Sequence, residues 1–179
     1  MKIALLGFGG MGKVVRTIAL ERGHEVPVIV DPSAAEVDDS HRHDALASAT
    51  EVKLDVAALK GIDVVIDFSS GDAVMENLKI CKSAGVNVVE GATGWYGKLG
   101  EVKKFVAEGN DDSNIGFLWS SNFSIGVNMY FKIVEAAAKL VNKFDEYDVW
   151  GTEIHHYNKV DSPSGTALSI RRSTTNPRI

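Results

Sequence analysis

Residues 1–12 read MKIALLGFGGMG, and this stretch decides the fold. An apolar run that stops at a cluster of glycines is typical of a strand that enters a tight turn. The apolar positions Val14, Val15, Ile18 and Ala19 that follow predict a helix with one buried face. The glycines therefore form the pattern G-x-G-x-x-G between a strand and a helix, the context in which this pattern indicates dinucleotide binding.

Each glycine of the pattern has a separate physical role. Gly7 permits the sharp turn, Gly9 lets the backbone approach a pyrophosphate, and Gly12 lets the helix pack closely on the strand. The free N–H groups and the positive dipole end of that helix then face the phosphates. The alternative is a glycine turn in an α/β protein of another kind, because the pattern on its own is weak.

An acidic residue follows the second apolar run, Glu25–Val30, at the distance that the fingerprint requires. Asp31 lies about 20 residues after the glycines, where a carboxylate accepts both ribose hydroxyls of an adenosine and repels a 2′-phosphate. This arrangement favours NAD over NADP. The alternative is that Asp31 merely starts a turn before Pro32.

Composition limits the class of protein. A hydrophobic content of 45% and a charged content of 24% allow a real core, and 179 residues fit one domain, or one domain and part of a second. The net charge of −5 and the lack of a basic run argue against a nucleic-acid partner. The single cysteine, Cys81, suits a reducing compartment, and the first apolar run is too short for a signal peptide or a membrane span. We therefore expect a soluble, cytoplasmic protein.

Strands and helices alternate up to residue 123. The sequence predicts strands within 62–66, 86–89 and 115–119 and helices at 71–84 and 98–107. This alternation indicates an α/β fold, a Rossmann-type parallel sheet with helices on both faces. Ligands of such sheets bind at the carboxyl ends of the strands. His41 and His43 lie in a polar stretch without further ligand spacing, so we expect an exposed loop there and no metal site.

The pattern changes after Phe123. Residues 124–142 predict a long amphipathic helix with Ser124 as its N-cap, and residues 145–154 predict a strand of a second unit. We therefore divide the chain into a dinucleotide-binding domain, 1–123, and an incomplete α+β substrate-binding and catalytic domain, 124–179.

A dense polar stretch, residues 153–167, carries the candidate catalytic groups. His155, His156 and Lys159 form a proton-transfer set, because imidazole titrates near neutral pH and a lysine holds a carboxylate or acts as an acid. Backbone and hydroxyl donors at Gly165 and Thr166 can hold a second carboxylate. Together they describe a pocket for a small dianion next to a hydride donor. The alternative is a polar surface loop with two solvated histidines.

Four segments of the chain resemble one known family, the 4-hydroxy-tetrahydrodipicolinate reductases of the diaminopimelate and lysine pathway. These segments are the glycine turn, GATGW at 91–95, SNFSIGVN at 121–128 and the polar stretch 153–167. The resemblance implies reduction of a cyclic dicarboxylate by NADH or NADPH with loss of water, and a homotetramer. It covers the chain from Met1 to about Ile170.

The resemblance also implies a role for individual residues. His155 is implied as the acid–base residue and Lys159 as the proton donor, while His156, Gly165 and Thr166 are implied to bind substrate. The residues implied to line the cofactor are Gly7, Phe8, Gly9, Gly10, Met11, Gly12, Asp31, Phe68, Gly91, Ala92, Thr93, Ser120, Ser121, Asn122 and Phe123.

The resemblance ends at about Ile170, so we expect residues 171–179 to lie outside the pattern of that family, whose members continue for many tens of residues past Thr166. We therefore expect a chain truncated at its C-terminus, with an uncovered apolar face on its second unit. Two alternatives to an active reductase stay open: a nucleotide-binding fragment without activity, and another nicotinamide-dependent dehydrogenase that acts on an amino or imino acid.

Overall fold

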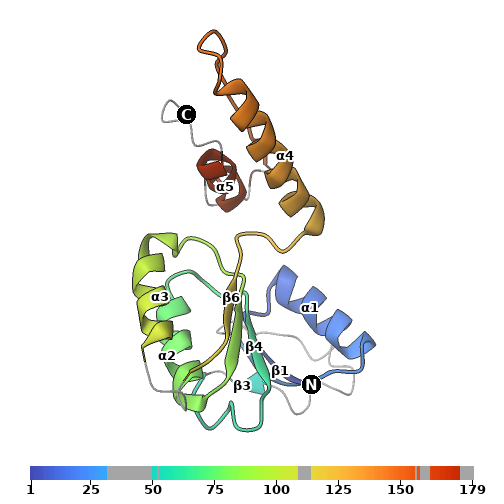
Figure 1. The fold of residues 1–179 in the computed structure, drawn as a ribbon. Helices are drawn as coiled ribbons and strands as arrows, with labels where there is room; N and C mark the ends of the chain where they lie inside the picture. The colour runs from blue at the N-terminus through green and yellow to red at the C-terminus, as the bar shows by residue number, and fades with distance from the viewer. Residues whose placement is uncertain (32–49, 52, 109–113, 156, 158–161, 174–179) are drawn as a thin grey trace. The chain divides into compact units, whose positions relative to one another are not determined.

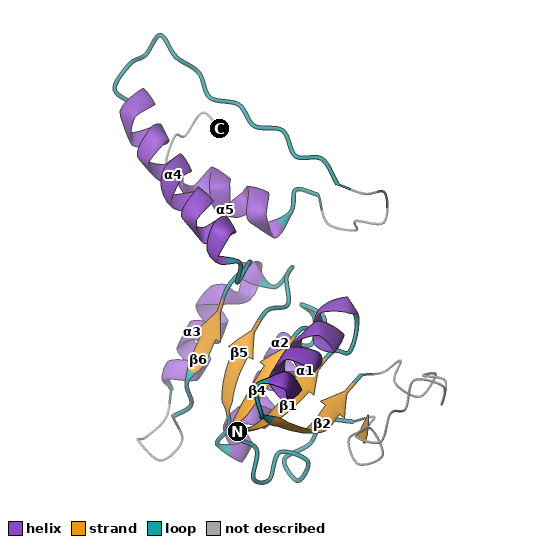
Figure 2. Cartoon of the chain, turned by 90° about the vertical axis from the view of Figure 1, so that its right-hand side faces the viewer, coloured by secondary structure: helices purple, strands orange, loops and turns teal. Residues whose placement is uncertain are grey.

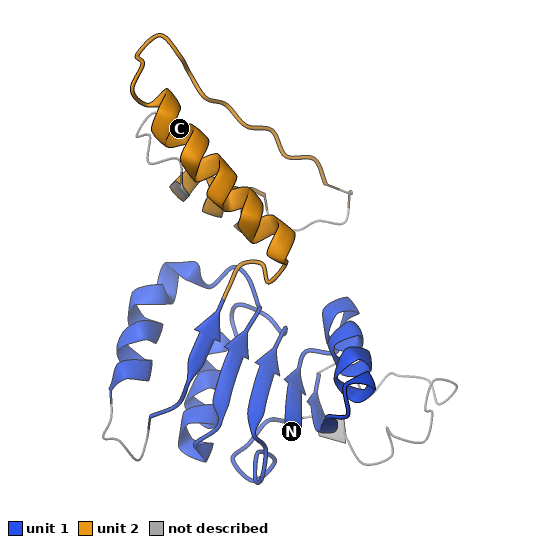
Figure 3. Cartoon of the chain, turned by 45° about the vertical axis from the view of Figure 1, so that its right-hand side comes forward, with its two compact units in different colours: residues 1–119 blue, residues 120–179 orange. Residues whose placement is uncertain are grey.

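The structure is a computed structural model that describes residues 1–31, 50–51, 53–108, 114–155, 157 and 162–173. The chain divides into two compact units, Met1–Trp119 and Ser120–Ile179 (Figure 3). Within the described ranges no helix has the length and the apolar character that crossing a membrane requires.

Unit 1 is a parallel sheet between two layers of helices, as the alternating pattern predicts. Its elements are β1 (Lys2–Leu6), α1 (Gly10–Glu21), β2 (Glu25–Val30), β3 (Thr50–Glu51), β4 (Val64–Asp67), α2 (Val74–Ala84), β5 (Asn87–Glu90), η3 (Tyr96–Lys98), α3 (Leu99–Ala107) and β6 (Phe117–Trp119). The strand order is β3-β2-β1-β4-β5-β6, and every neighbouring pair is parallel (Figure 2). This order is that of a Rossmann fold.

Both faces of the central strand are buried, which explains why its sequence is apolar without alternation. Ile3 and Leu5 pack in the layer that contains Ala19 of α1, while Ala4 and Leu6 pack in the opposite layer with α2 and α3. Figure 1 shows α1 on one face of the sheet and α2 and α3 on the other. Cys81 lies in the second layer, fully buried and with a free thiol, as its place in the helical pattern predicts.

The predicted buried face of α1 is correct only in part. Gly12 and Ala19 are buried, but Val14 and Ile18 are 50% and 41% exposed. The helix meets the sheet along the line through Gly12, Val15 and Ala19, which have helical spacing. Val14 and Ile18 each lie one residue before this line, so both point away from the core.

The remaining elements of unit 1 follow the sequence closely. The helix predicted at 71–84 begins at Val74, and Gly85, with a φ of 68°, ends it in the left-handed conformation that a glycine adopts without strain. The short strand β3, which pairs with β2, was not predicted. His41 and His43 lie outside the described residues.

The described part of unit 2 contains two helices, α4 (Ile125–Val141) and α5 (Gly165–Ser173). Ser124 is the N-cap of α4, as predicted, and its side chain accepts a hydrogen bond of 3.4 Å from the Val127 N–H. The more buried side of α4 carries the apolar residues that the pattern selects: Val127, Phe131, Val134, Ala138 and Val141.

The strand predicted at 145–154 is wrong. These residues form no ladder with any described residue: residues 145–146 form a turn, and residues 147–154 have no regular structure, with Tyr147, Trp150 and Ile154 exposed. An apolar and β-branched sequence favours a strand only when a neighbouring strand accepts its backbone hydrogen bonds.

Candidate functional site

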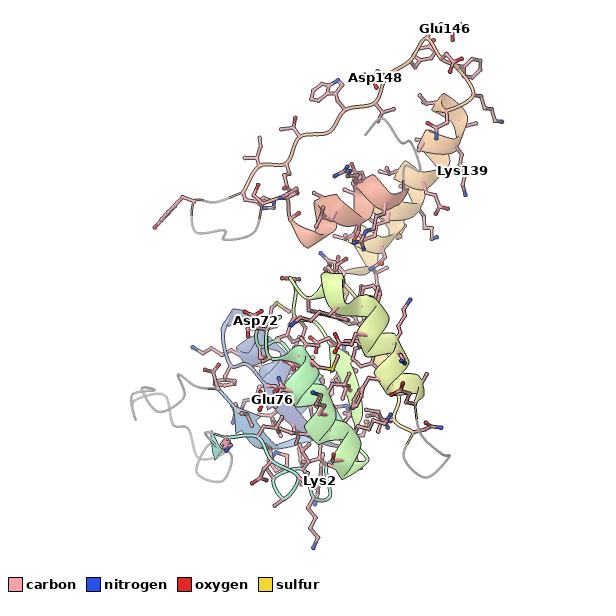
Figure 4. The ribbon with its side chains drawn as sticks, turned by 90° about the vertical axis from the view of Figure 1, so that its left-hand side faces the viewer. Lys2, Asp72, Glu76, Lys139, Glu146 and Asp148 are labelled. Atoms are coloured by element: carbon pink, nitrogen blue, oxygen red, sulfur yellow. The ribbon has the colours of Figure 1, made fainter. Side chains whose placement is uncertain are left out.

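The carboxyl edge of the sheet in unit 1 holds the first group of candidate residues. The chain order reverses between β1 and β4, and a Rossmann sheet binds its ligand at this switch point. Backbone hydrogen bonds continue past the strand ends, from Phe68 N to the Leu6 carbonyl at 2.7 Å and from Gly91 N to the Asp67 carbonyl at 2.8 Å. This edge lies toward Asp72, at the end of unit 1 opposite Lys2, in Figure 4.

The glycine turn at the end of β1 has the geometry that its sequence predicts. Gly7 has a φ of +83°, and an added Cβ would lie 2.5 Å from the Phe68 carbonyl oxygen. A Cβ on Gly12 would lie 2.1 Å from the Gly7 carbonyl oxygen, so the first turn of α1 packs directly on the turn. Only glycine fits at these two positions.

The N-terminus of α1 is open at the same turn. A Cβ on Gly9 or Gly10 would meet no atom within 4 Å. Gly9 is the N-cap, no side chain in the described part of the chain caps the helix, and its first turn contains no acidic residue. The first N–H groups of the helix therefore have no side-chain cap among the described residues, and a helix start of this kind attracts anions.

Asp31 lies against this turn, since its carboxylate accepts a hydrogen bond from the Phe8 N–H. The structure thus brings together the glycine pattern and the acid that sequence spacing paired with it.

The loop that follows β5 packs against the end of β4. A Cβ on Gly91 would lie 2.3 Å from the Phe68 ring, and a Cβ on Gly71 would lie 2.3 Å from the Thr93 carbonyl oxygen. Trp95 is 3% exposed, and its indole N–H donates to the Ala92 carbonyl at 2.9 Å. Phe68 and the Gly91–Thr93 backbone therefore lie together at the same edge as the glycine turn.

Two buried carboxyl groups, which are not among the predicted site residues, support these loops. Asp67 ends β4 and accepts hydrogen bonds from Ser69 N and Asn77 Nδ2, both at 2.8 Å. Glu90 ends β5 and accepts one from Ala92 N at 2.6 Å. Burial and then the charge of Asp67 raise the pKa of Glu90 to about 8, and burial also raises the pKa of Asp67. The feature of the sequence that could have identified both residues is an acidic residue at the end of a buried apolar run.

Ser120, Ser121, Asn122 and Phe123 follow β6 and belong to unit 2. They form a turn in which the Ser120 hydroxyl donates to the Asn122 carbonyl at 2.7 Å and the Asn122 side chain accepts from Ser124 N at 2.8 Å. Asn128 Nδ2 donates to the Asn122 carbonyl at 3.0 Å. The turn is thus held by the first residues of α4.

Glu153 is the residue of the polar stretch in unit 2 on which several hydrogen bonds meet. Its Oε2 lies 2.9 Å from His155 Nε2 and accepts a hydrogen bond of 2.6 Å from the Ser164 hydroxyl, while its Oε1 accepts from Ser164 N at 2.9 Å. These contacts, first the Ser164 hydroxyl and then His155, lower the pKa of Glu153 to about 2. Glu153 belongs to the polar stretch, but its residue type and position there predict no role.

Gly165 and Thr166 form the first turn of α5. Ser164 directly precedes them, and its hydroxyl accepts a hydrogen bond of 3.0 Å from Ala167 N, which caps the helix. His156 and Lys159 lie outside the described residues. In the described part of the chain, no group of three His, Cys, Asp or Glu side chains could hold a metal ion.

Comparison with known proteins identifies the family. The model of dihydrodipicolinate reductase, N-terminus, matches residues 1–123, and that of dihydrodipicolinate reductase, C-terminus, matches residues 126–178. The second match extends past Ile170, so the expectation that residues 171–179 lie outside the family pattern is wrong. The 4-hydroxy-tetrahydrodipicolinate reductase of Christiangramia forsetii is 36% identical over 95% of this chain and 62% of its own length. That of Chromobacterium violaceum is 44% identical over 64% of this chain and 40% of its own length. The chain thus spans less than two thirds of the curated relatives that it matches.

Solved structures agree with this assignment. A dihydrodipicolinate reductase from Paenisporosarcina sp. TG-14 with bound dipicolinate superposes with a TM-score of 0.69 at 25% identity, over 98% of this chain and 65% of that one. A scyllo-inositol dehydrogenase from Lactobacillus casei with bound NAD(H), at 17% identity and a TM-score of 0.52 over 80% of this chain and 41% of that one, shares the fold. The glycine turn, the switch point and the matches to both family models lead to one conclusion: this chain belongs to the dihydrodipicolinate reductase family.

Proposed function

We propose that the protein reduces 4-hydroxy-tetrahydrodipicolinate to tetrahydrodipicolinate with NADH or NADPH, in the diaminopimelate and lysine pathway. In this proposal residues 1–123 bind the dinucleotide and residues 124–179 form part of the substrate-binding and catalytic domain. The observation that carries it is the open, uncapped N-terminus of α1 at the switch point of the sheet. The names of the relatives and the dipicolinate in the Paenisporosarcina enzyme support the substrate class.

The residues of unit 1 fit a pyridine nucleotide. The N–H groups at Gly9–Gly12 hold the pyrophosphate, and Asp31 beside the turn accepts the ribose hydroxyls. A carboxylate at that position repels a 2′-phosphate, so we propose a modest preference for NADH. The remaining cofactor-lining residues are Phe68, Gly91–Thr93 and Ser120–Phe123. When bound, the reduced nucleotide supplies a hydride.

The residues of unit 2 supply protons and hold the substrate. Gly165 and Thr166, at the first turn of α5, bind one carboxylate through backbone and hydroxyl donors. His156 and Lys159 contact the substrate, and Lys159 donates a proton while His155 acts as acid and base. The reaction balances as one hydride and one proton gained and one water lost.

The family also suggests how the protein is organised in the cell. We propose a cytoplasmic homo-oligomer, a tetramer when the whole domain is present. Sedimentation of the protein with and without NADH tests the oligomeric state.

Turnover is the direct test of the proposed function. The protein is mixed with freshly generated cyclic substrate, and the near-ultraviolet absorbance of NADH or NADPH is followed for the wild type and for Lys159→Ala. The proposal predicts oxidation of the nucleotide that collapses in the variant, since the proton donor is lost. An absence of turnover with NADH still bound would leave a nucleotide-binding fragment and contradict the proposed reaction.

A further inference from the structure

Glu153 makes contact with both halves of the polar stretch in unit 2. Its two oxygens bond His155, two residues along the chain, and both the backbone and the hydroxyl of Ser164, eleven residues along. The side chains of Glu153 and His155 are 29% and 37% exposed, so the pair is accessible from solvent. One carboxylate therefore fixes the imidazole relative to the start of α5.

The ionised state of Glu153 determines which nitrogen of His155 carries the proton. Because Ser164 and His155 hold the pKa of Glu153 near 2, its carboxylate only accepts hydrogen bonds at neutral pH. The contact of 2.9 Å with His155 Nε2 is then a bond in which Nε2–H donates. In the neutral imidazole Nδ1 is left with a free lone pair, and among the described residues no group bonds it.

Ser164 links the same carboxylate to the amides that begin α5. Its hydroxyl donates to Glu153 and accepts from Ala167 N, and its backbone N–H donates to Glu153 Oε1. Ser164 is 5% exposed, and the bonds that it makes are partly buried. A shift of Glu153 would therefore move both His155 and the first turn of α5.

We propose that Glu153 is a positioning residue that holds His155 as the Nε2–H tautomer and thereby assigns proton exchange with the substrate to Nδ1. The role of His155 as the acid–base residue rests on the proposed function, but the tautomer does not. A carboxylate that orients a histidine in this way is a recurring device in catalytic sites.

The variant Glu153→Gln gives an opposite expectation for the tautomer. A glutamine amide has one acceptor atom, its oxygen. The backbone N–H of Ser164 donates to Oε1 in the wild type, so the amide oxygen must take the position of Oε1 in the variant. The amide NH₂ then takes the place of Oε2 and donates to His155 Nε2, which must be unprotonated. The imidazole switches to the Nδ1–H tautomer and loses the lone pair that the proposal assigns to catalysis.

Two variants serve as controls for this change. Ser164→Ala removes the hydroxyl that donates to Glu153 Oε2, the oxygen that also contacts His155. The contact between Glu153 and His155 is kept, so we expect the wild-type tautomer. Glu146→Gln removes one negative charge from the exposed segment after α4 without touching Glu153 (Figure 4). It reports the effect of net charge alone.

The experiment measures ring ¹⁵N chemical shifts of the full chain with labelled histidine, at a pH where the imidazole is neutral, with His155→Asn to assign the signals. The proposal predicts Nε2–H in the wild type, Ser164→Ala and Glu146→Gln, and Nδ1–H in Glu153→Gln. With the substrate, kcat of Glu153→Gln should fall by roughly 10- to 100-fold with a smaller change in KM, as for other residues that orient a histidine.

The outcomes separate this inference from the proposed function. Nδ1–H in the wild type, or an unchanged tautomer in Glu153→Gln, overturns the inference whatever the activity. A switched tautomer with unchanged kcat overturns the assignment of Nδ1 to proton exchange. If the wild type turns over no substrate, the proposed function fails, and the chemical shifts still decide whether Glu153 sets the tautomer.

Discussion

Asp67 and Glu90 are register partners at the carboxyl ends of β4 and β5, and both side chains are buried beneath α2 and α3. Asp67 accepts hydrogen bonds from Ser69 and Asn77, whereas the bond that Glu90 accepts comes from Ala92. Two neighbouring carboxylates in a low dielectric repel each other. The proton therefore resides on Glu90, the residue that holds the Gly91–Thr93 loop.

The pair makes the stability of the protein depend on pH. The pKa of Glu90 is about 8 in the folded chain, against an ordinary value of 4.5. The folded state thus binds more protons between these values, so the contribution of Glu90 to stability is complete below about pH 4.5 and is lost as pH rises toward 8. Glu90→Gln keeps the acceptor for Ala92 N and removes the ionisation. Between about pH 5 and about pH 8 the wild type loses this contribution to stability and the variant does not. The unfolding free energy of Glu90→Gln relative to that of the wild type should therefore rise by on the order of a few kcal/mol over this range.

Urea unfolding at these two pH values measures the unfolding free energy of the variant relative to that of the wild type. Glu76→Gln, an exposed position on α2, is the matched control and should follow the wild type at both (Figure 4). An equal difference between Glu90→Gln and the wild type at the two pH values would contradict the account of the buried pair.

Gly12→Ala tests the close packing of α1 on the glycine turn. Its Cβ would lie 2.1 Å from the Gly7 carbonyl oxygen, a backbone atom that cannot move aside without shifting the helix. We expect a loss of about 1–3 kcal/mol in unfolding free energy, which exceeds the helix-propensity gain of about 1 kcal/mol. The measurement is the urea midpoint of the variant.

Gly10→Ala is the control for this substitution. Its Cβ meets no atom within 4 Å, so its stability should equal or slightly exceed that of the wild type. If both alanine variants had the same midpoint, the contact at Gly12 would not be energetically important.

The solvent-facing side of α4 carries exposed apolar residues, from which we predict that the chain self-associates. Ile125, Met129, Ile133 and Leu140 are each at least 62% exposed and lie at successive helical spacings of four, four and seven residues. Exposed apolar patches of this kind drive association. Sedimentation velocity of the 179-residue chain should show species larger than a monomer, and Ile133→Lys should shift the population toward the monomer.

Lys132→Ala, at an exposed position one residue away, is the control for that change. A clean monomer over the whole accessible concentration range would be incompatible with association through this face.

Local patterns in the sequence predicted most of unit 1. The apolar runs and the glycine turn are local features, so β1, β2 and α1 begin and end close to the predicted residues. The buried carboxyl pair was not predictable in the same way, because register partners on two strands are set by the assembled sheet. The exposure of Val14 and Ile18 likewise depends on where α1 meets the sheet.

Unit 2 shows the same limit of local reasoning. The helix α4 and its N-cap follow from spacing and from Ser124. Residues 145–154 carry a strand-like sequence, but a strand needs a ladder partner that no local pattern supplies. Glu153 and Ser164 are eleven residues apart, and their contact requires a reversal of the chain that neither residue type encodes.

Binding of NADH to Gly9→Val tests most directly the central claim that the open start of α1 holds the nucleotide. Gly9 has a φ of −70° and free space at its Cβ, so valine fits the backbone, at a cost of about 1 kcal/mol or less at an N-cap. Its side chain would occupy the space that we propose for the pyrophosphate. Gly100→Val, at an exposed position on α3, is the matched control. In calorimetric titration the account predicts that the wild type and Gly100→Val bind NADH and that Gly9→Val, folded with nearly unchanged Tm, loses binding; NADH affinity in folded Gly9→Val equal to that of the wild type would contradict it.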